Sequence, residues 1–234
     1  MLWGLGPVQQ QAAYGLTVDR LRRQIHSGLL LPAEKLPPER QLSDDFGISR
    51  VTLREALRVL ETSDYITVRR GAHGGAFVTD EDRLVRLAVT RITRKPGDAM
   101  RVLEFLCSNE CAAVELAVTR VGLPERKRMG QALDLMQCAA TGPEVKQAET
   151  LFHLALGDAA HNMLFARAIE DALSELFLPF PSGAVVADRR RLHGQYAALL
   201  AALEAGAAGE SLAAIRAIHD GYWQQVRRVL NRAA

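Results

Sequence analysis

Two helical patterns separated by a short glycine-containing turn occupy residues 38–60. Pro38 and Glu39 are typical of a helix start. Gly47 fits a left-handed turn, where a Cβ would cost energy. Ser49 is a favoured residue for capping the helix that follows. Two helices joined by such a turn form a helix-turn-helix, and the segment therefore predicts that motif.

The flanking segments extend this unit. A helical pattern through Val18, Leu21 and Ile25 precedes it, and Gly28 ends that helix. After it, two β-prone runs at residues 65–70 and 76–78 flank a glycine-rich loop. The first 79 residues therefore predict a winged helix-turn-helix domain, in which the hairpin is the wing.

The rest of the chain has a different pattern. From Asp80 onwards Ala, Leu, Arg and Glu dominate, and proline and glycine divide the sequence into helix-sized segments. Seven helices with short connections predict a closed antiparallel bundle over residues 80–234. The expected fold class is mainly α. The expected helices span about 80–94, 98–120, 125–139, 144–160, 162–178, 188–205 and 209–230.

Composition excludes several classes of protein. The chain is 48% hydrophobic and 24% charged, as in an ordinary globular protein. No apolar run approaches the ~20 residues that cross a bilayer, and the first residues lack a secretory pattern, so no membrane association is expected. Three cysteines without Cys-x-x-Cys spacing favour a reducing cytoplasm. The net charge of +2 is weak evidence for nucleic-acid binding, although residues 1–79 carry 10 Lys and Arg against 8 Asp and Glu.

The helix-turn-helix segment resembles the winged-helix signature of the GntR superfamily. The resemblance spans about residues 17–79, and Ala33 and Ser43 depart from it where glycine and alanine are usual. Neither departure is expected at the DNA surface. The matching stretches are Leu36-Pro37-Pro38-Glu39-Arg40-Gln41-Leu42-Ser43, Phe46-Gly47-Ile48-Ser49-Arg50-Val51-Thr52-Leu53-Arg54-Glu55-Ala56-Leu57 and the glycine-rich wing that ends at Phe77-Val78.

Four residues in the first turns of the second helix suit contacts to DNA, because that end of the helix enters the major groove in this motif class. An arginine fork bonds both acceptors on a guanine edge, so Arg50 and Arg54 are the expected base readers. Ser49 and Thr52 carry hydroxyls suited to phosphate. A lone arginine is more often a solvated surface residue, but the full signature favours DNA contact.

Three further positions complete the predicted DNA-binding set. Arg40 contacts DNA by the resemblance, and His73 and Gly74 form the wing tip, where glycine lets the backbone approach the minor groove. The complete set is Arg40, Ser49, Arg50, Thr52, Arg54, His73 and Gly74.

Three histidines and one carboxylate in the second part are candidate metal ligands. Glu149 and His153 are four residues apart and share a helix face. His193 and His219 lie 14 residues before and 12 residues after the turn at Ala207, which places them at similar depth in an antiparallel pair. Such a set suits zinc, nickel or manganese. The alternative is that these histidines are hydrogen-bonded core residues.

The second part resembles the effector domain of the FadR-like branch, called the FCD domain, over about residues 80–230. The matching pieces are Glu149-Thr150-Leu151-Phe152-His153, Asn162, Arg191-Leu192-His193 and Ile218-His219. The resemblance implies a small-molecule effector and a divalent metal held by an acidic residue and three histidines.

Two departures from this branch bear on the effector. Glu149 stands where aspartate is usual, and Leu106 stands where a Glu-x-Arg pattern has arginine. An organic-acid effector would then depend on the metal alone, while Glu110 of the same pattern is expected to be structural.

The sequence therefore predicts a transcription regulator, a repressor or activator that binds palindromic operator DNA as a homodimer under control of an effector. A metalloenzyme using the same histidines is one alternative, but the chain has no His-Glu-x-x-His, Glu-x-x-His or Gly-x-Ser-x-Gly motif. A DNA-binding protein with an unliganded, vestigial bundle is the other.

Overall fold

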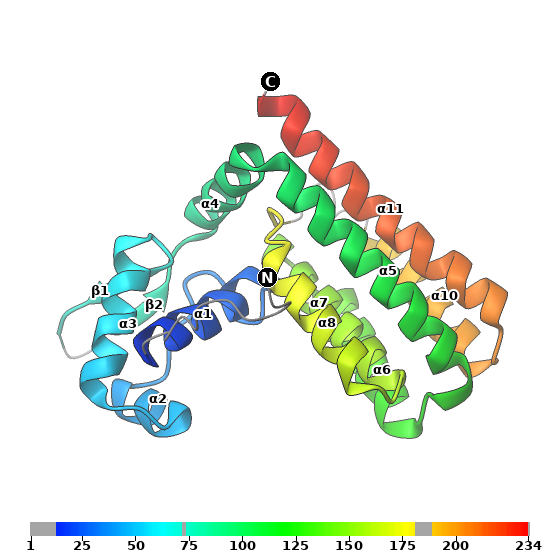
Figure 1. Cartoon of the computed structure of the whole chain (residues 1–234), viewed down its shortest axis with the longest axis horizontal. Coiled ribbons are helices and arrows are strands. Elements are labelled where there is room, and N and C mark those ends of the chain that lie inside the picture. The colour runs from blue at the N-terminus through cyan, green and yellow to red at the C-terminus, as the bar shows by residue number, and fades with distance from the viewer. Residues whose placement is uncertain (1–12, 72–73, 181–188, 234) are drawn as a thin grey trace, which may run out of the picture.

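The computed structural model describes residues 13–71, 74–180 and 189–233, which form two lobes joined through a helix (Figure 1). One lobe holds α1 (Ala13–His26), α2 (Glu39–Phe46), α3 (Arg50–Thr62), β1 (Ile66–Arg69) and β2 (Gly75–Val78). The other follows α4 (Glu81–Arg94), and its helices are α5 (Pro96–Arg120), α6 (Leu123–Cys138), α7 (Gly142–Ala159), α8 (Met163–Glu175), α10 (Arg189–Glu204) and α11 (Ala208–Ala233). The mainly α fold class is confirmed.

Local chemistry explains the helix-turn-helix. Gly47 adopts φ 64° and ψ 35°, the left-handed conformation that the sequence predicts, and ends α2. The backbone N–H of Thr52 donates to the Ser49 side chain at 3.1 Å, so Ser49 caps α3. One face of α3 is buried and carries Leu53, Ala56, Leu57 and Leu60.

The wing is a two-stranded antiparallel hairpin that pairs Ile66 with Val78 and Arg69 with Gly75. Lys35 extends the pairing through an isolated bridge to Phe77.

The helical lobe is built around α5, which packs against α7, α8, α10 and α11. Its core is apolar, with Leu103, Phe152 and Leu199 among its fully buried residues. Among the described residues no helix combines the length and apolar character needed to cross a membrane.

The apolar core of the winged lobe extends beyond residue 79. Leu84 and Ala88 of α4 belong to it, and so do Phe177 and Phe180, which follow α8. Phe177 stacks on the buried His26 ring at 4.0 Å and 6° between planes. The ring nitrogens of His26 lie 3.0 Å from the Ser174 carbonyl oxygen and 2.8 Å from the Tyr65 hydroxyl. The segment after α8 therefore completes the core of the winged lobe.

Ala33 has φ 61°, so this alanine occupies a left-handed position. We expect Ala33→Gly to stabilise the protein by about 0.5–1 kcal/mol, because relief of the left-handed side-chain penalty exceeds the extra entropy of glycine in the unfolded chain. Urea unfolding measures the change. Ala213→Gly, at an exposed position within α11, is the control and should instead destabilise by about 1 kcal/mol. A loss of stability in both variants would contradict the prediction.

Candidate functional site

The first turn of α3 presents hydroxyls and amides at the surface of the winged lobe. The Ser49 and Thr52 hydroxyl oxygens lie 2.8 Å apart, and Ser49 Oγ also accepts from the Thr52 N–H. A helix start carries partial positive charge and attracts anions. The N-terminal end of α3 therefore presents groups that can bond an anion.

Arg50 and Arg54 are both exposed and lie one turn apart on α3. Arg54 Nε donates to Glu39 Oε2 at 2.8 Å, in an exposed ion pair between α3 and the start of α2. No ion pair joins Arg50 to another residue in the described part of the chain. The two guanidinium groups can thus reach outward from the face of α3 that the core leaves free.

The other predicted DNA contacts flank this face. Arg40 is exposed in the first turn of α2. Gly74 lies between the strands, where an added Cβ would come within 2.4 Å of the Arg69 carbonyl oxygen, so that only glycine fits. His73 lies outside the described residues.

Val51 is a surface feature that the sequence pattern does not distinguish. Two residues before Leu53, it lies on the face of α3 opposite the core, and its side chain is 69% exposed beside Arg50. An exposed aliphatic group next to an arginine on such a helix suits contact with a thymine methyl. Arg58, one turn after Arg54, continues the cationic face.

A buried polar cluster lies in the helical lobe, centred on Glu110 of α5. His153 Nδ1 lies 2.6 Å from Glu110 Oε1, without hydrogen-bond alignment, and His219 Nε2 lies 2.7 Å from Glu110 Oε2. Burial alone would raise the pKa of Glu110, but His153 and His219 outweigh it and lower that pKa to about 2. Glu110 is therefore a carboxylate that links α5 to α7 and α11.

Two tyrosines complete the cluster. The hydroxyls of Tyr196 from α10 and Tyr222 from α11 lie 2.8 and 3.0 Å from His153 Nε2 and 3.3 Å from each other. Burial raises the pKa of both phenols well above 10, so the hydroxyls stay protonated. Both ring nitrogens of His153 thus face protein groups.

Lys146 and Glu149 of α7 add two more charges. Glu149 Oε1 accepts from the Tyr196 hydroxyl at 3.5 Å, and Lys146 Nζ lies 5.6 Å from the centroid of the Tyr222 ring. Burial raises the pKa of Glu149 and lowers that of Lys146, while their mutual attraction opposes both shifts. The cluster therefore contains a buried amine as well as two carboxyl groups.

His193 lies apart from this cluster, contrary to the predicted convergence of four ligands. With Arg189, Arg190 and Gln137 it lines a separate pocket of about 270 Å³. Tyr196, three residues further along α10, occupies the inward position instead. Among the described residues no three His, Cys, Asp or Glu side chains are grouped so as to hold a metal ion.

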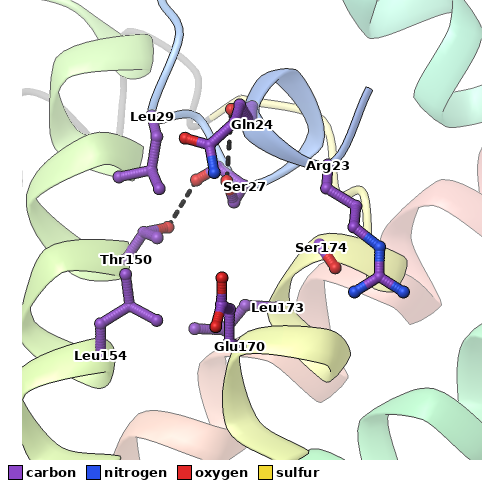
Figure 2. Close-up of a pocket in the computed structure, with 9 residues that line it drawn as sticks. All are labelled: Arg23, Gln24, Ser27, Leu29, Thr150, Leu154, Glu170, Leu173 and Ser174. Atoms are coloured by element: carbon purple, nitrogen blue, oxygen red, sulfur yellow. Dashed lines mark hydrogen bonds between the residues drawn. The ribbon is translucent and has the colours of Figure 1, made fainter. Parts of the chain in front are cut away.

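The winged lobe contacts the helix that carries this cluster. The Thr150 hydroxyl donates to the Ser27 carbonyl at 2.6 Å, and Gln147 Nε2 donates to the Leu29 carbonyl at 3.3 Å. Figure 2 shows the Thr150 contact above a small cavity of about 20 Å³ between α1, α7 and α8. Gly28 packs so closely that an added Cβ would lie 2.9 Å from Lys146 Cγ. A shift of α7 would therefore move the end of α1.

A larger groove of about 580 Å³ runs between the lobes. Ile92, Val102, Leu176 and Phe177 contribute its apolar side chains, and Tyr65 borders it from the winged lobe. This volume lies in the range of small-ligand sites. Arg91, Arg94, Lys95 and Arg101 are among its polar lining residues.

The two lobes match two known families. Residues 13–78 match the family described as bacterial regulatory proteins, gntR family, and residues 101–221 match the FCD domain.

Individual relatives agree with these matches. An HTH-type transcriptional regulator, RmpR, from Mycobacterium gastri is 29% identical over 176 residues, which cover 70% of this chain and 62% of that protein. The Uxu operon transcriptional regulator of Escherichia coli is 31% identical over 140 residues, covering 57% of this chain and 52% of that protein. This chain thus spans less than two thirds of either relative.

A solved structure of E. coli McbR/YncC resembles this fold with a TM-score of 0.51 at 20% identity, covering 96% of this chain and 100% of that one.

Proposed function

Because the chain belongs to the gntR family of bacterial regulatory proteins and carries an FCD domain, we propose that it is a sequence-specific DNA-binding transcription regulator under small-molecule control. It would act in the cytoplasm as a homodimer on two-fold related half-sites. The relatives named above are themselves described as transcriptional regulators.

The outward face of α3 is the observation that carries this proposal. It places Arg50 and Arg54 beside a capped helix start, and Glu39 of α2 pairs with Arg54. Arginine in this setting bonds guanine edges, while Ser49 and Thr52 suit the phosphate backbone. Gly74 supports an additional contact by the wing. We assign these residues, with Arg40 and His73, to the DNA-binding surface.

Control by an effector is supported by the contacts between the lobes. A ligand that binds the helical lobe with different affinity in two conformations would shift the population between them. The Thr150 hydroxyl of α7 donates to the Ser27 carbonyl at the end of α1, and the Lys146 side chain packs against Gly28. We propose that displacement of α7 changes the placement of the DNA-binding surfaces, and through it the affinity for operator.

A divalent metal held by Glu149, His153, His193 and His219 is not part of the proposed function, because the side chains do not fit it. His193 is absent from the cluster, and the nitrogens of His153 and Nε2 of His219 face protein atoms. An organic-acid effector coordinated through such a metal is therefore left out as well.

A second candidate function is DNA binding with a bundle that takes no ligand. The closed cluster around Glu110 favours it, because its polar atoms already contact one another. The groove of about 580 Å³ favours an effector instead. Thermal unfolding in the presence of a panel of small molecules distinguishes the two, since a ligand that binds only the folded protein raises its Tm.

Arg50→Ala tests the assignment of the base reader. On a duplex enriched from random sequences by the wild-type protein, we expect the variant to lose about 1–3 kcal/mol of binding free energy. Fluorescence anisotropy at fixed salt measures it. Arg86→Ala on the exposed face of α4 removes the same charge outside α3 and should bind like the wild type. Unchanged specific binding by Arg50→Ala would refute the assignment.

A further inference from the structure

We infer that the helical core of this chain works without a resident metal ion, with protein groups in the position that a metal would take. Tyr196 and Tyr222 close the side of His153 on which a metal would bind, and the buried Lys146 side chain packs beside Tyr222. The inference concerns the helical lobe alone and does not depend on the DNA-binding role.

The bonding of His153 is the first support. Its Nδ1 lies 2.6 Å from Glu110 Oε1, and the hydroxyls of Tyr196 and Tyr222 lie 2.8 and 3.0 Å from its Nε2. A metal ligand needs a neutral imidazole with a free lone pair and room for the ion beside it. On both sides of the His153 ring that room is taken by protein oxygens.

The bonding of Glu110 is the second support. One of its oxygens meets His153 and the other meets His219. Glu110 is fully buried, so it cannot take up water if a metal draws these histidines away. A buried carboxylate without partners is strongly unfavourable. The pairing therefore occupies Nε2 of His219, while Nε2 of His153 is covered by the two tyrosines instead.

Tyr196 and Tyr222 stand one turn from His193 and His219 on the same two helices, α10 and α11. They are therefore the residues that these helices present to His153, in place of two imidazoles. A protonated phenol is a poor ligand for zinc, nickel or manganese, which are held by imidazole, thiolate and carboxylate groups. The hydroxyls also fill the space between the helices, because they approach His153 Nε2 to 2.8 and 3.0 Å.

Lys146 is the third support. Its side chain is 3% exposed, and its Nζ lies 5.6 Å from the centroid of the Tyr222 ring, whose hydroxyl contacts His153. The space beside the two tyrosines is therefore already filled by a further side chain of this chain.

Metal content is the direct test. Wild-type protein without an affinity tag is incubated with zinc, nickel and manganese in turn, desalted and measured by plasma mass spectrometry. We expect less than about 0.1 equivalent of each metal and a Tm unchanged by EDTA, in contrast to a structural metal, whose removal unfolds such domains. About one equivalent in the wild type, lost in His153→Ala, would overturn the inference.

A double variant, Tyr196→His with Tyr222→His, tests whether the tyrosines are the closing groups. Imidazole is shorter than phenol, so the substitutions open space beside His153 and supply two nitrogens in place of two hydroxyls. We expect the variant to gain about one equivalent of zinc and a zinc-dependent rise in Tm. Tyr196→Phe with Tyr222→Phe, which adds no ligand, should stay metal-free. If the histidine variant is folded by circular dichroism yet binds no zinc, the role given to the tyrosines is wrong.

Discussion

Replacement of Glu110 by alanine should destabilise the protein by about 3–5 kcal/mol, because it leaves His153 and His219 in the core without their shared partner. Glu110 and His153 are fully buried and His219 nearly so, so water cannot replace the lost carboxylate. The loss is a large part of the 5–15 kcal/mol by which a typical protein is stable. Urea unfolding followed by circular dichroism measures it.

Two variants and a pH series test whether the loss of stability comes from the buried carboxylate of Glu110. Glu104→Ala, at an exposed position of the same helix, should change stability by less than about 0.5 kcal/mol. Glu110→Gln keeps the shape of the side chain and one acceptor, so its stability should lie between those of Glu110→Ala and Glu104→Ala. The pKa of Glu110 is lowered from 4.5 to about 2, so its contribution is complete above pH 4.5 and is lost as the pH falls toward 2. Equal stability of Glu110→Ala and Glu104→Ala would contradict the central place of Glu110.

Replacement of Phe177 by alanine should also cost about 3–5 kcal/mol, since it empties a buried aromatic site. Phe177 lies in the apolar core of the winged lobe, although it follows α8 of the helical lobe. Its ring stacks on His26, whose nitrogens lie beside Tyr65 and the Ser174 carbonyl. The variant should therefore loosen the winged lobe as well as the joint between the lobes. Hydrogen exchange of α1 and α3, together with urea unfolding, reports both effects.

Phe105→Ala is the matched control for Phe177. This phenylalanine of α5 is 50% exposed, so its loss should cost far less than that of Phe177. If Phe177→Ala left the protection of α1 and α3 from hydrogen exchange unchanged, the claim that the segment after α8 completes the core of the winged lobe would be wrong.

The helix-turn-helix could be predicted from the sequence because its determinants are local. Gly47 needs a left-handed backbone, and Ser49 caps the helix three residues before Thr52, so neighbouring residues decide both features. The helices after residue 80 could be predicted for the same reason, since proline and glycine mark their limits.

The buried cluster could be predicted only in part. Counting residues from the turn at Ala207 gave similar depths for His193 and His219, but depth does not determine which side chain meets another helix. A difference of three residues, about 4.5 Å along a helix, exchanges His193 for Tyr196. The packing of Phe177 against His26 joins residues 151 positions apart, and no local signal in either segment predicts such a contact.

Selection of bound duplexes from a random DNA library by the purified protein tests the central claim most directly. We expect enrichment of one short motif repeated with two-fold symmetry, because two copies of α3 would each contact a half-site in the major groove. Arg50→Ala should fail to enrich the same motif. Recovery of DNA without any preferred sequence by the wild-type protein would contradict the assignment of a sequence-specific regulator.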